Sequence, residues 1–474
     1  WRGPGRKDDP CPYANLAIAV AVVWDDQRGV YDYTGHQRRT RSKLPEGRPG
    51  AIENFKYIVD AERFMQGRGQ FLPWEFLTNV VNHRTPVAER QWALVNYLPK
   101  RVMIGKCYGD VPYDSGMLDS GGKIVRLEGK DYTLPNLRQF GGVCAMQADF
   151  AARVGKSLGV PAAYVGGTAK SGEGHAWVMW VELKGVSRTS IAFTLESHGR
   201  YRGDRYYVGH LRDPQTGQGI TDRQLELRLH TVGMNPLAKR QADFLMAAFP
   251  MLRRKTEMDV LGQLGFLDQV IRLCPGNEAP WKAVAQMSRE GVLTRKHQKT
   301  MLKVLDGLFT TFARFPDFTW TVFDDLVAFQ DVPRQRDQLY GRLVKLYEAA
   351  GRPDLACEAR LKYADYLVAE NRHKEAIEGL AFTIKKFPDE GRYVPKMLDK
   401  LENICQGVEG AQQQLVLFYQ QFLPMIPKTR GSRPSPYCIR MYERAIDRFQ
   451  KAGRPQLAAA CQAELQRLRG PNQP

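Results

Sequence analysis

The chain has 474 residues, and the usual size of about 100–200 residues per domain predicts two to four domains. Hydrophobic residues make up 43% and charged residues 25%, and 43 Gly with 28 Pro are too few for a collagen-like or mostly disordered chain. The longest apolar run, residues 16–24, is much shorter than the about 20 residues that a membrane-spanning helix needs. The composition therefore argues against an integral membrane segment.

Lys and Arg outnumber Asp and Glu by 69 to 51, which gives a net charge of +18. The excess is spread over both halves of the chain, and no basic tail stands out. Such a field favours an anionic polymer or another acidic partner, although a solvated basic surface without a dedicated partner is the simpler explanation. Eight cysteines without any C-x-x-C pair do not form the pattern of a disulfide scaffold or a zinc finger.

The first 50 residues are predicted to be an N-terminal extension and linker. The apolar residues 16–24 fit a buried strand or a short helix, whereas residues 32–50 are polar and rich in turn-forming residues. Apolar residues then recur at helical spacing over residues 51–98, and residues 99–138 are rich in turns again. We expect residues 51–134 to be a helical lead-in that packs on the next domain.

Residues 135–232 have the clearest patterns of secondary structure in the sequence. "GGVCAMQADFAARVGKSLG" predicts a helix, "VPAAYVGG" a short strand and "GHAWVMWVEL" a strand buried on both faces. "TSIAFTLES" and "RYYVGHLRD" predict two more strands. A helix followed by an antiparallel sheet is an α+β arrangement.

Residues 235–474 are predicted to form an all-α array of helical hairpins. "AGRPDLAC" at 350–357 recurs as "AGRPQLAA" at 452–459. The offset of 102 is three times the 34-residue period of tetratricopeptide repeats, although a non-repetitive bundle explains one recurrence as well. Stacked hairpins offer a surface for a protein partner and no chemistry of their own.

Cys144 and His175 are the candidate catalytic pair. Cys144 begins a predicted helix, where unsatisfied backbone N–H groups and the helix dipole stabilise a thiolate. His175 begins an apolar strand, where a general base for the thiol has large neighbours that exclude water. A buried structural cysteine and a core histidine are the alternatives for these two residues.

A third group should orient the imidazole, and two acids are candidates. Glu196 ends the next predicted strand and would reach the far ring nitrogen from an antiparallel neighbour, while Asp204 is the substitute. Gln139, five residues before Cys144, is the candidate oxyanion donor together with the Cys144 N–H. An ordinary strand-end acid and a loop glutamine are the alternatives for Glu196 and Gln139.

The text around Cys144 and the "GHAWV" of His175 resembles the transglutaminase-like superfamily of papain-type thiol enzymes, over roughly residues 135–200. The resemblance implies a Cys-His-Asp triad that attacks amide carbonyls and requires no cofactor or metal. The chain departs from the family at the third position, where "AFTLE" brings Glu196 in place of Asp.

A cysteine peptidase acting on a peptide or protein substrate is the expected function. The alternatives are an inactive fold that serves with the helical array as a binding module, and a scaffold for an anionic partner. Because the chain opens on Trp1 and family members are often exported, an extracytoplasmic location is favoured.

Overall fold

The computed structural model describes residues 11–25, 28–169, 174–187, 189–200, 208–255, 258–330, 332–430 and 433–469. The chain divides into two compact units: the first comprises the described residues up to Thr168 and Gly174–Met287, and the second comprises Ala169 and the described residues from Ser288. Asp204 and the first part of the strand predicted for "RYYVGHLRD" lie outside the described residues. No helix in the described segments is long and apolar enough to cross a membrane.

The first unit opens with short helices, which pack around the later sheet. The apolar run lies in a helix, α1, and the predicted linker contains α2 together with the buried Tyr33 and Thr40. The helical prediction for residues 51–98 is confirmed, and the turn-rich stretch holds a 3-10 helix and two short α-helices. The elements are α1 (Ala14–Trp24), α2 (Thr34–Arg39), α3 (Ala51–Asp60), α4 (Glu62–Met65), α5 (Arg68–Phe71), α6 (Trp74–Val81), α7 (Val87–Tyr97), η1 (Leu98–Asp110), α8 (Ser115–Asp119) and α9 (Leu134–Phe140).

A five-stranded antiparallel sheet follows, which confirms the α+β class. Its strands are β1 (Ala162–Thr168), β2 (Gly174–Val186), β3 (Ile191–His198), β4 (His210–Arg212) and β5 (Gly219–Thr221). Their spatial order is β3-β2-β1-β4-β5. The long hairpin of β2 and β3 forms because β-branched and aromatic residues fill both strands, and it supplies one edge of the sheet.

Helix α10 (Cys144–Ser157) packs on β1 and β2, and 13 of its 14 residues are buried. The small residues Ala148, Ala151 and Gly155 lie on its side toward the sheet, as their spacing predicts. A Cβ atom on Gly155 would lie 2.9 Å from the Ala162 Cβ atom. Glycine therefore permits the close approach that fixes the helix on the strands.

Four more helices follow in the first unit: α11 (Asp222–Met234), α12 (Pro236–Lys255), α13 (Val260–Leu273) and α14 (Glu278–Arg289), of which α14 extends two residues past its end at Met287. Gly233 of α11 lies against Phe193 of β3. The helices from residue 235 to Met287 thus belong with the sheet, and the all-helical unit begins later than the predicted boundary at 235.

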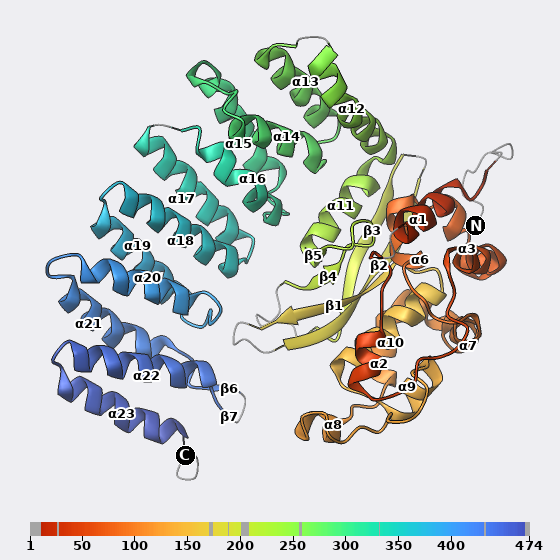
Figure 1. Cartoon of the computed structure of the whole chain (residues 1–474), viewed down its shortest axis with the longest axis horizontal. Helices are drawn as coiled ribbons and strands as arrows, with labels where there is room; N and C mark the ends of the chain where they lie inside the picture. Colours follow the sequence, from red (N-terminus) through yellow and green to blue (C-terminus); the bar gives the residue numbers. More distant parts are fainter. Residues whose placement is uncertain are drawn as a thin grey trace. The chain divides into compact units, whose positions relative to one another are not determined.

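The second unit is a succession of antiparallel helices with a small two-stranded ribbon (Figure 1). Its elements are η2 (Arg295–His297), α15 (Gln298–Thr311), α16 (Asp317–Val327), α17 (Pro333–Ala349), α18 (Pro353–Ala369), α19 (His373–Lys386), α20 (Val394–Gln406), α21 (Ala411–Phe422), η3 (Leu423–Met425), β6 (Thr429–Arg430), β7 (Arg433–Pro434), α22 (Pro436–Lys451) and α23 (Pro455–Arg469).

Both copies of the recurring "AGRP" text form the same turn between two helices. Gly351 and Gly453 adopt left-handed φ values of 65° and 66°, and the next N–H donates to a carbonyl five residues back at 2.8 Å. However, the first turn joins α17 to α18 and the second joins α22 to α23, so the offset spans five helices. Three repeats of two helices would span six. The recurrence therefore reflects a common helix-ending motif, and not a 34-residue repeat.

Candidate active site

Cys144 is the first residue of α10 and its thiol is half-buried. Of the other cysteines, Cys11 is exposed and the remaining six are buried. The N-cap residue Val143 is extended and offers no side-chain acceptor to the first turn of the helix. The Met146 N–H donates to the Val143 carbonyl at 2.8 Å, which leaves the N–H groups of Cys144 and Ala145 to stabilise a negative charge at the thiol.

The turn that enters α10 depends on Gly141. Its φ is 86° and ψ is −169°, a conformation essentially restricted to glycine, and an added Cβ would lie 2.2 Å from the Pro112 carbonyl oxygen. The neighbouring Gly142 pairs with Tyr113, which ties this turn to the preceding segment. The "FGG" text before Cys144 thus positions the thiol.

Cys144, Tyr31 and Tyr164 are partly buried residues that pack against the same core, and Tyr164 is close to Cys144. Burial raises the pKa of the Tyr164 hydroxyl to about 12, and the nearby Cys144 acts in the same direction. The Tyr164 ring lies 5.9 Å from the Tyr31 ring and 4.9 Å from the His36 ring, measured between centroids. Tyr31 and His36 lie more than 100 residues before Cys144 in the sequence, and Tyr164 lies on the strand that follows α10. No motif in the sequence indicated these neighbours.

His175 is the second residue of β2 and lies opposite Gly167. Its Nε2 atom is 2.6 Å from the Gly199 carbonyl oxygen. Because a carbonyl only accepts, Nε2 carries the proton in this contact. Burial lowers the pKa of His175, while the bond to Gly199 opposes this effect.

The course of β2 argues against the predicted contact between the Cys144 sulfur and the His175 ring. Ala176 and Val178 pack with α10, and side chains alternate along a strand, so His175 leaves β2 on the opposite face. No hydrogen bond of the Cys144 side chain occurs among the described residues. Cys144 and His175 nevertheless lie at the same end of the sheet. Tyr164, which is close to Cys144, is only three residues from Gly167 on β1, and Gly167 lies opposite His175.

Glu196 is not placed to orient His175. It pairs with Trp180, five residues along β2 from His175, which is about 16 Å at the rise of an extended strand. Directly opposed residues project to the same face, so Glu196 shares the face of Trp180 and not that of His175. The prediction that β3 is the antiparallel neighbour of β2 is confirmed. The predicted register, which would place Glu196 beside His175, is wrong. The substitute, Asp204, lies outside the described residues.

Gln139 lies near the end of α9 with an exposed side chain. Its amide makes no hydrogen bond to the described part of the chain, and nothing directs it toward Cys144. Its predicted role as oxyanion donor therefore rests on proximity in sequence alone.

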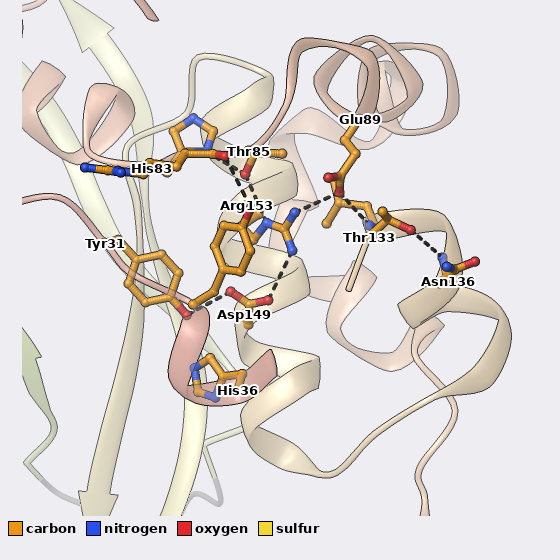
Figure 2. A network of polar contacts seen from close by, with 12 residues as sticks. Tyr31, His36, His83, Thr85, Glu89, Thr133, Asn136, Asp149 and Arg153 are labelled. Carbon is orange, nitrogen blue, oxygen red and sulfur yellow. Dashed lines mark hydrogen bonds and ion pairs between the residues drawn. The ribbon is translucent and has the colours of Figure 1, made fainter. Parts of the chain in front are cut away.

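A buried polar network is centred on Asp149 and Arg153, which lie on α10, the same helix as Cys144 (Figure 2). Arg153 donates to Glu89 at 2.7 Å, to Thr85 at 3.0 Å and to Asp149 at 3.4 Å, and the Tyr31 hydroxyl donates to Asp149 at 2.8 Å. Burial opposes the charge of Arg153, but the two carboxylates outweigh it and raise its pKa. The network ties α10 to α7 and to the N-terminal segment.

Lys156 is a second buried cation on α10. Its Nζ atom donates to the Asn79 carbonyl at 2.6 Å and to the Asn82 side chain. No carboxylate in the described part of the chain pairs with it, and burial lowers its pKa to about 7. Charged residues in a helix usually mark a solvated face, so no pattern in the sequence indicated the buried contacts of Arg153 or Lys156.

No group of three His, Cys, Asp or Glu side chains in the described segments is placed to hold a metal ion.

Comparisons with known proteins leave the chain without a family. No family model matches it, and no curated protein is similar to it. Among solved structures, BtubC (BKLC) from P. vanneervenii aligns with 50% of this chain and 95% of its own, at 12% identity and a TM-score of 0.22. A score this low carries no argument about fold or function.

Proposed function

We propose that the first unit is a thiol enzyme of the transglutaminase-like type that acts on amide carbonyls of a peptide or protein, with hydrolysis as the expected outcome. The observation that carries the proposal is the position of Cys144, a half-exposed thiol at the uncapped start of a 14-residue helix. A thiolate there meets the positive end of the helix dipole and can reach a substrate.

In this mechanism the Cys144 thiolate attacks the carbonyl carbon, and the carbonyl oxygen takes the negative charge near the Cys144 N–H. The C–N bond then breaks, the amine leaves with the proton that His175 took from the Cys144 thiol when the thiolate formed, and a thioester remains. Water attacks the thioester and releases the acid and the thiol. His175 faces away from α10 in the described structure, so the start of β2 must rotate when substrate binds and carry the ring from the Gly199 carbonyl to the Cys144 side.

The test is the rate of iodoacetamide labelling at pH 7, read site by site by mass spectrometry. Exposed Cys11 is the internal control, because it lies outside any helix. We expect Cys144 to label at least about tenfold faster than Cys11, and His175→Asn to slow the labelling of Cys144. Labelling of Cys144 that is no faster than that of Cys11 would refute the proposal.

A second candidate function is protein binding by the helical unit. The exposed apolar side chains Phe382 on α19 and Leu417 on α21 favour it, with exposed fractions of 59% and 57%. Lys385 on α19 donates to Gln421 on α21, so the helix faces that carry these side chains adjoin. A Cys144→Ser protein that keeps every measured activity, with a Phe382→Ser protein that loses partner binding, would favour this function.

A further inference from the structure

A cavity of about 490 Å³ lies in the first unit, away from the residues around Cys144. Its walls come from α6, the turn at residues 213–215, α11, the start of α12 and the start of α14. This volume is in the range of small-molecule sites, about 300–1,000 Å³. None of the residues assigned to the thiol chemistry lines it.

The apolar part of the lining favours an organic ligand. Trp74 of α6 and Leu225, Leu229 and Val232 of α11 supply it. Pockets with an apolar lining and a few polar groups bind the carbon skeleton of a ligand and orient its polar ends.

The charged groups of the lining do not balance. Arg228 pairs with Asp213 at 2.8 Å, and Lys239 and Lys282 each pair with a carboxylate four residues away on the same helix, Asp243 and Glu278 respectively. Every cation of the cavity is thus neutralised. Glu75 has no ion pair among the described residues. Burial raises the pKa of its carboxyl group, while the charges of the nearby Lys239 and Arg240 oppose this effect.

Two lining residues carry a side-chain oxygen without a partner in the described structure. The Oδ1 atom of Asn79, a residue with 3% of its surface exposed, accepts no hydrogen bond, and neither does Oε1 of Glu278. Both oxygens are enclosed, so the side chain must rotate to present either one to the cavity. Buried acceptors are rarely left without donors. A ligand with N–H donors and a positive charge would satisfy such an oxygen and pair with Glu75.

From this cavity we infer a binding site for a small aliphatic amine, held as its ammonium ion by Glu75 and Asn79 with its carbon chain against Trp74 and the α11 leucines. The absence of a three-ligand metal cluster among the described residues argues for an organic cation over a divalent metal. The ring of Trp74 adds a cation–π or apolar contact to the same ligand.

The test is calorimetric titration of the full chain with 1,5-diaminopentane, 1-pentanol and pentanoate as probes. We expect the diamine to bind and the alcohol and the acid to bind at least about tenfold more weakly, because hydrogen bonds to charged groups are the strong ones. Glu75→Gln should weaken diamine binding by about tenfold or more.

Asp268→Asn is the matched control, since Asp268 is an exposed acid on α13 whose Arg272 partner lies outside the cavity. It should leave diamine binding unchanged, and circular dichroism should verify that both variants are folded. Equal binding of the three probes, no binding of the diamine, or equal affinity of the Glu75→Gln and unmodified proteins would each overturn the inference. The site is independent of Cys144, so its test stands whatever the thiol labelling shows.

Discussion

The Arg153 guanidinium donates to the Glu89 carboxylate at 2.7 Å inside the first unit, where the Arg153 side chain is fully buried and that of Glu89 is 7% exposed. Glu89 also accepts the backbone N–H of Leu134 at 2.7 Å, at the start of α9. The Glu89 carboxylate of α7 therefore binds both α10, through Arg153, and α9, through Leu134. Removing one partner of such a pair leaves an uncompensated buried charge.

The first prediction concerns this pair. Glu89→Ala should lower the free energy of unfolding by about 3–5 kcal/mol, because the buried Arg153 would keep its bond to the neutral Thr85 hydroxyl and only the longer contact to the Asp149 carboxylate. Urea unfolding followed by tryptophan fluorescence measures the change. Glu128→Ala, which breaks the exposed pair with Arg41, should leave the unfolding curve unchanged. Equal effects of the two substitutions would contradict the described burial.

The second prediction concerns Lys156 and pH. Its pKa is about 7 when folded and about 10.4 when unfolded, so the unfolded chain binds more protons between these values. Its contribution should make the free energy of unfolding rise from pH 7 toward pH 10, by up to ~1.4 kcal/mol per pH unit. Below pH 7 the folded protein carries the full cost of the buried charge.

Urea unfolding at pH 7, 8 and 9 tests this slope. Lys156→Met should flatten it, whereas Lys123→Met, at an exposed position, should leave it as it is. A slope that survives Lys156→Met would assign the pH dependence to other groups.

The third prediction concerns the turn before Cys144. Gly141→Ala should destabilise the first unit by at least ~2 kcal/mol, because its backbone conformation excludes a side chain and the Pro112 oxygen occupies the space. Gly129→Ala is the control: its φ is also positive, at 73°, but nothing lies within 4 Å of the added Cβ. It should cost only about 1–2 kcal/mol. Thermal unfolding compares the two proteins.

The fourth prediction contrasts two glycines of the helical unit. Gly351→Ala should destabilise it by about 1–2 kcal/mol, since φ is 65° at the end of α17. Gly341→Ala, ten residues earlier inside α17 with open space around the added Cβ, should stabilise it by up to ~1 kcal/mol. Changes of the same sign in thermal unfolding would contradict the assigned turn.

The elements around Cys144 could be predicted because their patterns are strong. Small residues at helical spacing predicted α10, and the apolar runs bounded by glycine predicted β1 and β2. The shared face of His175 and Trp177 follows from alternation. The face that α10 covers could not be predicted, because β2 is apolar on both sides and either face could have received the helix.

The remaining differences have related physical causes. The register of β3 against β2 set the position of Glu196, and it depends on a hairpin with a bulge between Leu183 and Gly185. Helices α11 to α14 look like the helices after them, and amphipathic periodicity does not tell which core a helix joins. The recurring "AGRP" text marked the ends of helices correctly, but such turns follow helix chemistry and need no regular repeat.

The burial of α10 also sets how its backbone exchanges hydrogen with solvent. A helix with 13 of 14 residues enclosed has no local opening that exposes its amides without dismantling the sheet around it. Its amide protons should therefore exchange with deuterium more slowly than those of any peripheral helix in the first unit, at a rate that reports the cooperative opening of that whole unit.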